Sequence, residues 1–205
     1  NSVTFVQRSD ENTKRDFPFD YELKIKYTIN GDTVTNEYIV TNTGEDKLPF
    51  VIGGHPAFNC PLAKGEKFED YKVVFYKNIT KPCLRPDHHT GLVNVFEKFD
   101  EMHGGDTLSL VHELFEEKDA LIFENCEAKS ATLIGKSGKG VKIEFQDMNN
   151  LLIWSAVGNA PFVALEPWTG LASCNDEDGL FEHKRGMTVL EKDETASFKF
   201  KITMI

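Results

Sequence analysis

Two titratable side chains, far apart in the sequence, stand in similar surroundings. His55 lies in Gly53-Gly54-His55-Pro56-Ala57-Phe58-Asn59, and Glu166 lies in Leu165-Glu166-Pro167-Trp168. Each follows an apolar, strand-like run and is flanked by glycine, which lets the backbone approach a ligand closely, or by proline, which fixes the φ angle of the adjoining turn. A histidine and a carboxylate that meet in one cleft are enough to move protons on a neutral substrate. The pair therefore predicts an enzyme.

His55 comes directly after the apolar run Leu48–Ile52, so it stands where a strand leaves a sheet. Histidine changes charge near neutral pH, which suits a proton donor in a cleft. An ordinary histidine satisfied by backbone partners is the alternative interpretation. The two glycines before it and Pro-Ala-Phe-Asn after it favour the functional one. Asn59 is then placed to orient a hydroxyl group or the imidazole.

Glu166 interrupts the apolar run Phe162–Leu165. A carboxylate at the end of a buried strand costs free energy unless it is paired or used in function. Partial desolvation raises the pKa of such a group toward the range of a general base. Trp168 offers a flat apolar surface on which a sugar ring can stack. A structural ion pair with Lys or Arg is the alternative for Glu166.

Asp119, just before Ala120–Phe123, is a third candidate for substrate binding. An aspartate that simply begins a strand fits the same pattern equally well. No metal or cofactor site is predicted. Cys83, His88 and His89 lack a second ligand pair of zinc-finger spacing, and Gly135-Lys136-Ser137 stands between two strand-like runs, so it reads as a hairpin turn and not as a phosphate loop.

Composition limits the partners. The 205 residues carry 23 Lys and Arg against 33 Asp and Glu, a net charge of −10. This charge repels nucleic acid and anionic membranes, which leaves small neutral molecules as the expected ligands. No apolar run approaches the length of about 20 residues that a membrane-spanning helix needs. Four widely spaced cysteines without a CxxC pair favour a reducing, cytoplasmic location.

The pattern of the chain is that of an all-β protein. Residues 21–29 alternate between apolar and polar side chains, Asn30-Gly31-Asp32 supplies a turn, and 33–40 continue as a second strand. Only His112–Lys118 has a short helical pattern. Many short antiparallel strands in residues 1–205 predict one large β-sandwich domain. Further strands are expected at 71–76, 107–110, 120–123, 131–134, 141–145, 151–156, 162–165, 188–190 and 197–202.

The motifs around these residues resemble the aldose 1-epimerase (galactose mutarotase) family, in particular its bacterial LacX-like branch. The resemblance covers nearly the whole chain. It implies a β-sandwich of the galactose mutarotase-like supersandwich type, acting on free aldoses without a cofactor. The matching segments are Phe17-Pro18-Phe19-Asp20-Tyr21-Glu22-Leu23, Gly54-His55-Pro56-Ala57-Phe58-Asn59-Cys60-Pro61, Leu152-Ile153-Trp154-Ser155 and Glu166-Pro167-Trp168-Thr169-Gly170.

The resemblance also implies roles. Glu166 takes the proton of the anomeric hydroxyl, His55 protonates the ring oxygen, and the opened sugar recloses as the other anomer. The family often has an aspartate that binds sugar hydroxyls at the position of Asp119. The motifs themselves add Phe58, Asn59 and Trp168 as expected contacts to a neutral hexose such as galactose or glucose. We expect His55 and Glu166 on opposite sides of one hexose-wide hollow.

Two features differ from the family pattern. Relatives have a second histidine, in a His-Gly motif, and an arginine in an N-terminal portion, and nothing in this sequence matches them. The sequence also starts without methionine, in Asn1–Gln7, which has the pattern of a strand interior. We therefore expect an upstream part of the domain that this sequence lacks. A non-catalytic sugar-binding or sensor domain, or a structural sandwich, remains the alternative to the epimerase.

Overall fold

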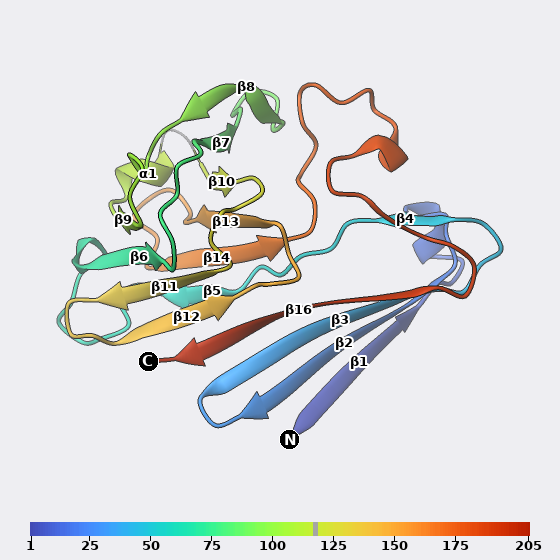
Figure 1. The fold of residues 1–205 in the computed structure, drawn as a ribbon, viewed down its shortest axis with the longest axis horizontal. Helices are drawn as coiled ribbons and strands as arrows, with labels where there is room; N and C mark the ends of the chain where they lie inside the picture. Colours follow the sequence, from blue (N-terminus) through green and yellow to red (C-terminus); the bar gives the residue numbers. More distant parts are fainter. Residues whose placement is uncertain (117–118) are drawn as a thin grey trace.

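Antiparallel strands make up almost all of the regular structure (Figure 1). The computed structural model describes residues 1–116 and 119–205. Its larger sheet has eight strands, in the spatial order β1 (Ser2–Arg8), β2 (Tyr21–Asn30), β3 (Thr33–Asn42), β16 (Thr195–Met204), β12 (Gly140–Glu144), β11 (Ser130–Gly135), β6 (Tyr71–Phe75) and β9 (Thr107–Ser109).

The second sheet has six strands and carries the candidate site. Their order is β5 (Ala57–Asn59), β14 (Phe162–Trp168), β13 (Asn150–Trp154), β10 (Leu121–Phe123), β7 (Cys83–Pro86) and β8 (Val93–Phe99). A separate pair joins β4 (Leu48–Phe50) to β15 (Thr188–Leu190). The short helical segments are η1 (Thr13–Arg15), η2 (Phe68–Asp70), α1 (Glu113–Glu116) and η3 (Phe181–His183). The predicted all-β antiparallel sandwich is confirmed.

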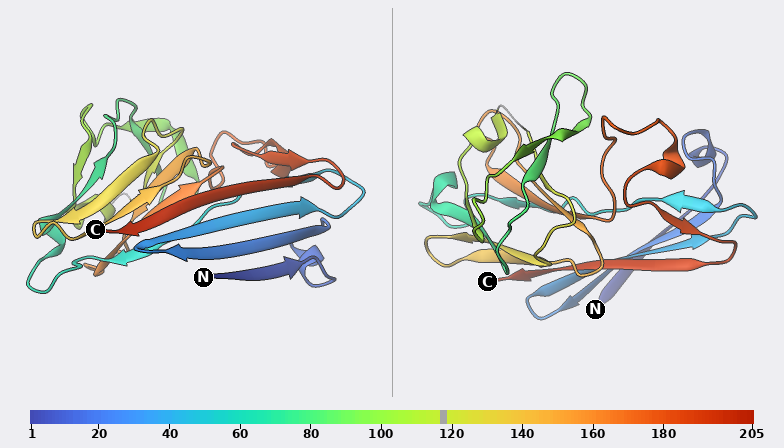
Figure 2. Two further views of the ribbon diagram at one scale, coloured as in Figure 1. Left: turned by 60° about the horizontal axis from the view of Figure 1, so that its bottom comes forward. Right: turned by 45° about the horizontal axis from the view of Figure 1, so that its top comes forward.

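The strands that begin the chain form a long ribbon. β2 and β3 pair over ten residues each, and Gly31 in the turn between them adopts a φ of 57°, which glycine takes without a steric cost. In the two views of Figure 2, β1, β2, β3 and β16 run side by side as extended strands. The predicted hairpin at Asn30-Gly31-Asp32 is confirmed, and so is the hairpin that joins β11 to β12.

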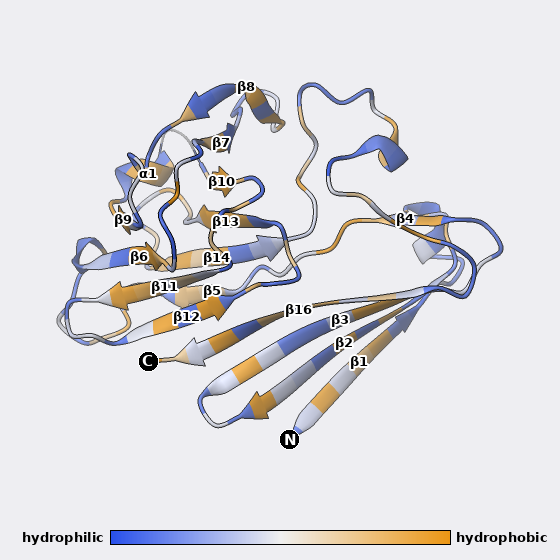
Figure 3. Ribbon diagram, in the orientation of Figure 1, coloured by the Kyte–Doolittle hydropathy of each residue, from blue (hydrophilic) through white to orange (hydrophobic). Residues whose placement is uncertain are grey.

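The main core lies between the two large sheets. In β14 the alternation of a strand sends Val163 and Leu165 into this core, and it sends Ala164, Glu166 and Trp168 to the opposite face. Figure 3 shows the apolar residues gathered on β10, β11 and β13, whereas β1–β3 alternate with hydrophilic residues. A smaller apolar cluster covers the other face of the six-stranded sheet, with Leu84, Val93, Ile122 and Leu152 among its members.

Some local expectations differ from the structure. The strands β7 and β8 were not predicted, because Pro82 and Pro86 at the ends of β7 and the polar side chains of β8 weaken the strand pattern. The helical pattern at 112–118 gives only the four-residue α1, and positions 117–118 lie outside the described residues. Within the described ranges, no helix has the length and apolarity of a membrane span.

Candidate active site

The position of His55 is set by a strand register. Ala57 pairs with Ala164 in β14, and Gly53 forms a bridge with Trp168 further along the same strand. These two pairings share one register, and it places His55 directly across from Glu166. Backbone hydrogen bonds from Gly54 N to Pro167 O (3.0 Å) and from Leu165 N to Pro56 O (3.1 Å) hold the segment there. Side chains opposite each other in an antiparallel pair are close enough to interact.

The two glycines before His55 permit this pairing. A Cβ on Gly53 would lie 2.3 Å from the ring of Trp168, and a Cβ on Gly54 would lie 2.5 Å from the ring of Phe200. Real Cβ atoms do not approach other atoms so closely. The sequence suggested that these glycines let the backbone approach a ligand. The structure shows instead that they let the His55 segment pack between the sheet and its neighbours.

Replacing Gly54 with alanine is expected to destabilise the protein by about 1–3 kcal/mol, as overpacking of a well-filled core does. The new methyl group displaces the buried Phe200 ring or pushes the His55 segment away from β14. Urea unfolding at constant pH measures the loss. Gly44→Ala is the matched control, because the nearest atom to its added Cβ is Asp20 Cβ at 3.1 Å, whereas the Cβ on Gly54 would come within 2.5 Å of the Phe200 ring. Equal stabilities for the two variants would contradict the packing argument.

Glu166 is a buried acid, and among the described residues its close polar partner is His55. Its side chain is 3% exposed, and Oε1 lies 3.3 Å from Nε2 of His55. Burial raises the pKa of Glu166 from the ordinary 4.5 to about 7, and the negative charge of Asp119 adds to the rise. The alternative of an ion pair with Lys or Arg is wrong for the part of the chain that the structure describes, where the partner is His55.

His55 itself lies at the rim. Its side chain is 58% exposed, and its imidazole meets the indole of Trp154 edge to face, with ring centroids 5.7 Å apart. The expectation that a hexose-wide hollow separates His55 from Glu166 is wrong in this structure, because the two side chains are within hydrogen-bonding distance. One side of the pair is therefore open to solvent, and the other is enclosed.

A cavity of about 220 Å³ connects the site residues. Cavities for drug-sized ligands usually measure about 300–1,000 Å³, so this smaller cavity suits one small molecule. His55, Glu166, Asp119 and Trp168 all line it, so the structure brings four of the six predicted residues together. The remaining wall is mostly apolar and comprises Pro86, Gly91, Val93, Ala120, Ile122, Leu152, Trp154 and Ala172.

The other two predicted residues lie outside this cavity. The side chain of Phe58 packs against the main core, on the opposite face of the sheet from Glu166. Asn59 is exposed at the end of β5, where it pairs with Phe162. Phe58 misses the cavity because the alternation of the strand turns its side chain toward the core. Asn59 misses it because it pairs with Phe162, two residues further from Glu166 than Ala164, the partner of Ala57.

Trp168 does more than line the cavity. Its indole Nε1 donates a hydrogen bond of 3.1 Å to the carbonyl oxygen of Gly54, which fixes the ring against the His55 segment. Trp154, to which the sequence gave no role, also lines the cavity. It follows Leu152 by two positions in β13, and that spacing was the available signal that both side chains share a face.

Comparison with known proteins shows the family to which the chain belongs. The family model described as aldose 1-epimerase matches residues 1–203. The chain is 36% identical to the plasmid-encoded protein LacX of Lactococcus lactis subsp. lactis over an alignment of 209 residues, which covers all of this chain and 69% of LacX. The chain belongs to the aldose 1-epimerase family. The resemblance to its LacX-like branch is thereby confirmed.

Solved structures of family relatives have the same fold. The galactose mutarotase related enzyme from Lactobacillus acidophilus superposes with a TM-score of 0.90 at 26% identity, and the match covers all of this chain and 68% of that one. A galactose mutarotase-like protein from Lactobacillus casei superposes with a TM-score of 0.87 at 29% identity, over all of this chain and 70% of its own. The described residues of the chain therefore have the galactose mutarotase-like fold.

Proposed function

We propose that this protein is an aldose 1-epimerase, which interconverts the α and β anomers of a free aldose. The observation that carries the proposal is the contact between His55 and the buried Glu166, in a cavity that Trp154 and Trp168 also line. Membership of the aldose 1-epimerase family supports it. A cross-strand acid–imidazole pair at the mouth of an apolar cavity is suited to moving two protons on one sugar.

The proposed reaction is one of proton transfer. Ionised Glu166 takes the proton from the hydroxyl on C1, and protonated His55 gives a proton to the ring oxygen. The bond between C1 and the ring oxygen breaks as the C1 carbonyl forms. The aldehyde turns about the C1–C2 bond, and the hydroxyl that was the ring oxygen attacks the other face of C1. In this step His55 takes its proton back and Glu166 returns a proton to the oxygen on C1. Neither side chain is consumed.

The burial of the pair suggests how a sugar enters. Glu166 is enclosed, whereas His55 stands at the exposed rim with room to turn. In this proposal the anomeric hydroxyl replaces the imidazole as the partner of Glu166, and His55 moves to the ring oxygen. Asp119 is placed to accept a hydrogen bond from a sugar hydroxyl, and the indoles of Trp154 and Trp168 offer apolar surface to the ring.

The cavity favours a neutral substrate. Among the described residues that line it, the charged or titratable side chains are His55, Asp119 and Glu166. Two carboxylates in a protein with a net charge of −10 disfavour a phosphate or carboxylate on the sugar. We therefore propose a hexose such as galactose or glucose as the substrate.

Polarimetry tests the function. Freshly dissolved α-galactose and α-glucose are followed as their optical rotation relaxes, with and without the protein. Acceleration in proportion to protein concentration is the expected result. Calorimetric binding of the sugar without acceleration would replace the epimerase with a non-catalytic sugar-binding domain, and the absence of both would reject sugar as the ligand.

The rate is expected to depend on pH through Glu166. The base form is the ionised carboxylate, and its pKa is about 7. Below that pH, kcat/KM for mutarotation is expected to fall about tenfold for each pH unit, since the ionised fraction falls by that factor. Polarimetry between pH 5 and 8, corrected for the buffer-catalysed rate, measures the profile. A rate that stays constant down to pH 5 would contradict the assignment of Glu166 as the base.

A further inference from the structure

A buried arginine lies just outside the candidate cavity. The side chain of Arg85, in β7, is 3% exposed, and its neighbour Pro86 lines the cavity. One terminal nitrogen, Nη1, donates to the carbonyl oxygens of Leu114 (2.7 Å) and Asp119 (3.3 Å). The other, Nη2, donates to Glu101 Oε1 at 2.9 Å. A buried cation is costly unless it is paired, and these bonds tie the guanidinium group of Arg85 to the main chain at Leu114 and Asp119.

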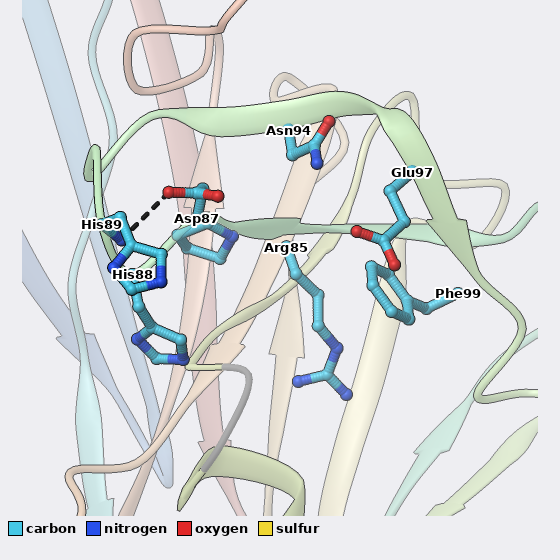
Figure 4. Close-up of a pocket in the computed structure, with 8 residues that line it drawn as sticks. Arg85, Asp87, His88, His89, Asn94, Glu97 and Phe99 are labelled. Carbon is cyan, nitrogen blue, oxygen red and sulfur yellow. Dashed lines mark hydrogen bonds between the residues drawn. The ribbon is translucent and has the colours of Figure 1, made fainter.

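Figure 4 shows the surroundings of this side chain. It runs from β7 away from Asp87, His88 and His89, which lie at the other end of a hollow of about 250 Å³ between β7 and β8. The guanidinium group lies 5.6 Å from the ring centre of Phe99. Arg85 thus points toward the end of α1, where free helix carbonyls lack partners within the helix.

The backbone that Arg85 holds is unusual. Asp119 has a φ of 54°, in the left-handed region, which is uncommon for a residue with a Cβ although aspartate adopts it more readily than most. Its amide donates to Phe115 O at 3.2 Å, and its carbonyl accepts the bond from Arg85. Both main-chain groups of Asp119 are therefore occupied in this conformation, which leaves its side chain in the wall of the cavity that also contains Glu166.

We propose that Arg85 is a positioning residue, which holds the main chain at Asp119 so that the Asp119 carboxylate stays in the wall of the cavity that Glu166 also lines. This inference rests on the proposed function. Two carboxylates in one cavity repel each other, so a fixed Asp119 keeps Glu166 protonated to higher pH. The only other titratable side chain that lines the cavity among the described residues is His55.

Lysine cannot replace Arg85 in this role. The planar guanidinium group spans two carbonyl oxygens and a carboxylate at once, whereas an ammonium group is a compact point donor. Arg85→Lys therefore keeps the charge but loosens the main chain at Asp119. We expect the Asp119 side chain to spend less time beside Glu166, so that the pKa of Glu166 falls.

A double-mutant cycle tests the inference. The titration of the Glu166 carboxyl carbon is followed by NMR in the wild type, Arg85→Lys, Asp119→Asn and the double variant. Asp119→Asn removes the like charge and is expected to lower the midpoint by about one pH unit. Arg85→Lys is expected to lower it in the same direction, and the double variant to match Asp119→Asn alone, because Arg85 acts through the Asp119 carboxylate.

The controls separate the possible outcomes. Thermal unfolding reports on the fold, and Glu101→Gln, which leaves both carbonyl bonds of Arg85 in place, is expected to leave the titration unchanged. If the lysine variant does not fold, the cycle is repeated with Arg85→Gln. This substitution removes a positive charge, but it does so both in the wild type and in Asp119→Asn, so the effect of the lost charge cancels when the two shifts are compared. A lower melting temperature with an unshifted midpoint, or fully additive shifts, would overturn the proposal.

The NMR readout does not depend on catalysis. A missing mutarotase activity would therefore reject the proposed function while the titration still decides the role of Arg85. Where activity is present, the acid limb of the pH profile of kcat/KM is expected to shift with the NMR midpoint in each variant.

Discussion

Replacing Glu166 with glutamine is expected to lower kcat/KM for mutarotation by about 10²–10⁴-fold, the usual contribution of a general base. Glutamine fills the same space but cannot accept the proton of the anomeric hydroxyl. Sugar binding is expected to persist, since the tryptophans and Asp119 remain in the cavity wall. Polarimetry on α-galactose measures the rate, and calorimetry measures the binding.

Glu144→Gln is the matched control for this experiment. Glu144 ends β12 in the other sheet, where its carboxylate pairs with Lys142 at 3.3 Å near the surface. The same chemical change there is expected to leave the rate unaltered. Full activity in Glu166→Gln would remove the assignment of the base and with it the proposed mechanism.

The second large effect concerns stability. The pKa of Glu166 is about 7 in the folded protein, whereas an ordinary glutamate, as in the unfolded chain, has a pKa of 4.5. Between these two values the folded chain binds a proton that the unfolded chain has released, so the free energy of unfolding falls as the pH rises. The whole shift corresponds to about 3 kcal/mol, a contribution that is fully present below pH 4.5 and lost by a little above pH 7.

The glutamine variant cannot titrate at this position. Its stability relative to the wild type is therefore expected to rise by about 3 kcal/mol between pH 4.5 and pH 8. Urea unfolding at several pH values measures the difference, and Glu144→Gln should follow the wild-type curve throughout. Parallel curves for Glu166→Gln and the wild type would show that burial does not perturb this carboxyl group.

Together the two predictions describe a conflict between activity and stability. At neutral pH the buried carboxylate is expected to be the group that catalysis needs most, and it also weakens the fold. Such a trade-off is common where a site holds a charge in a poorly solvated place. A variant that gains stability at pH 8 while it loses its rate would show both effects at one residue.

The sequence predicted the parts of the site that depend on local pattern. The apolar run Phe162–Leu165, which Glu166 interrupts, marked Glu166 as an acid in a buried strand, and the structure shows its side chain 3% exposed. The hairpin of β2 and β3 could be predicted because its turn residues and the alternating residues of both strands lie within about 20 residues of each other. The resemblance to the aldose 1-epimerase family supplied the fold as a whole.

The parts that depend on distant contacts could not be predicted. Nothing in the sequence specifies that 53–59 pair with β14 in the one register that sets His55 across from Glu166. Phe58 was assigned to the substrate because its motif was considered without knowing which face of β5 it occupies. Arg85 escaped notice because its partners, Leu114 and Asp119, are about 30 residues further along the chain.

The ladder between 53–59 and β14 has a consequence for how such a protein can diversify. Backbone pairing sets the spacing of His55 and Glu166, the donor and the acceptor of the proposed reaction, so this spacing does not depend on the segments that surround the cavity mouth. In the proposed epimerase, substitutions or insertions in the β7–β8 connection and in the residues after Leu171 can therefore change which sugar is bound. The His55–Glu166 pair of the proposed reaction would stay the same, while the residues that select the substrate vary.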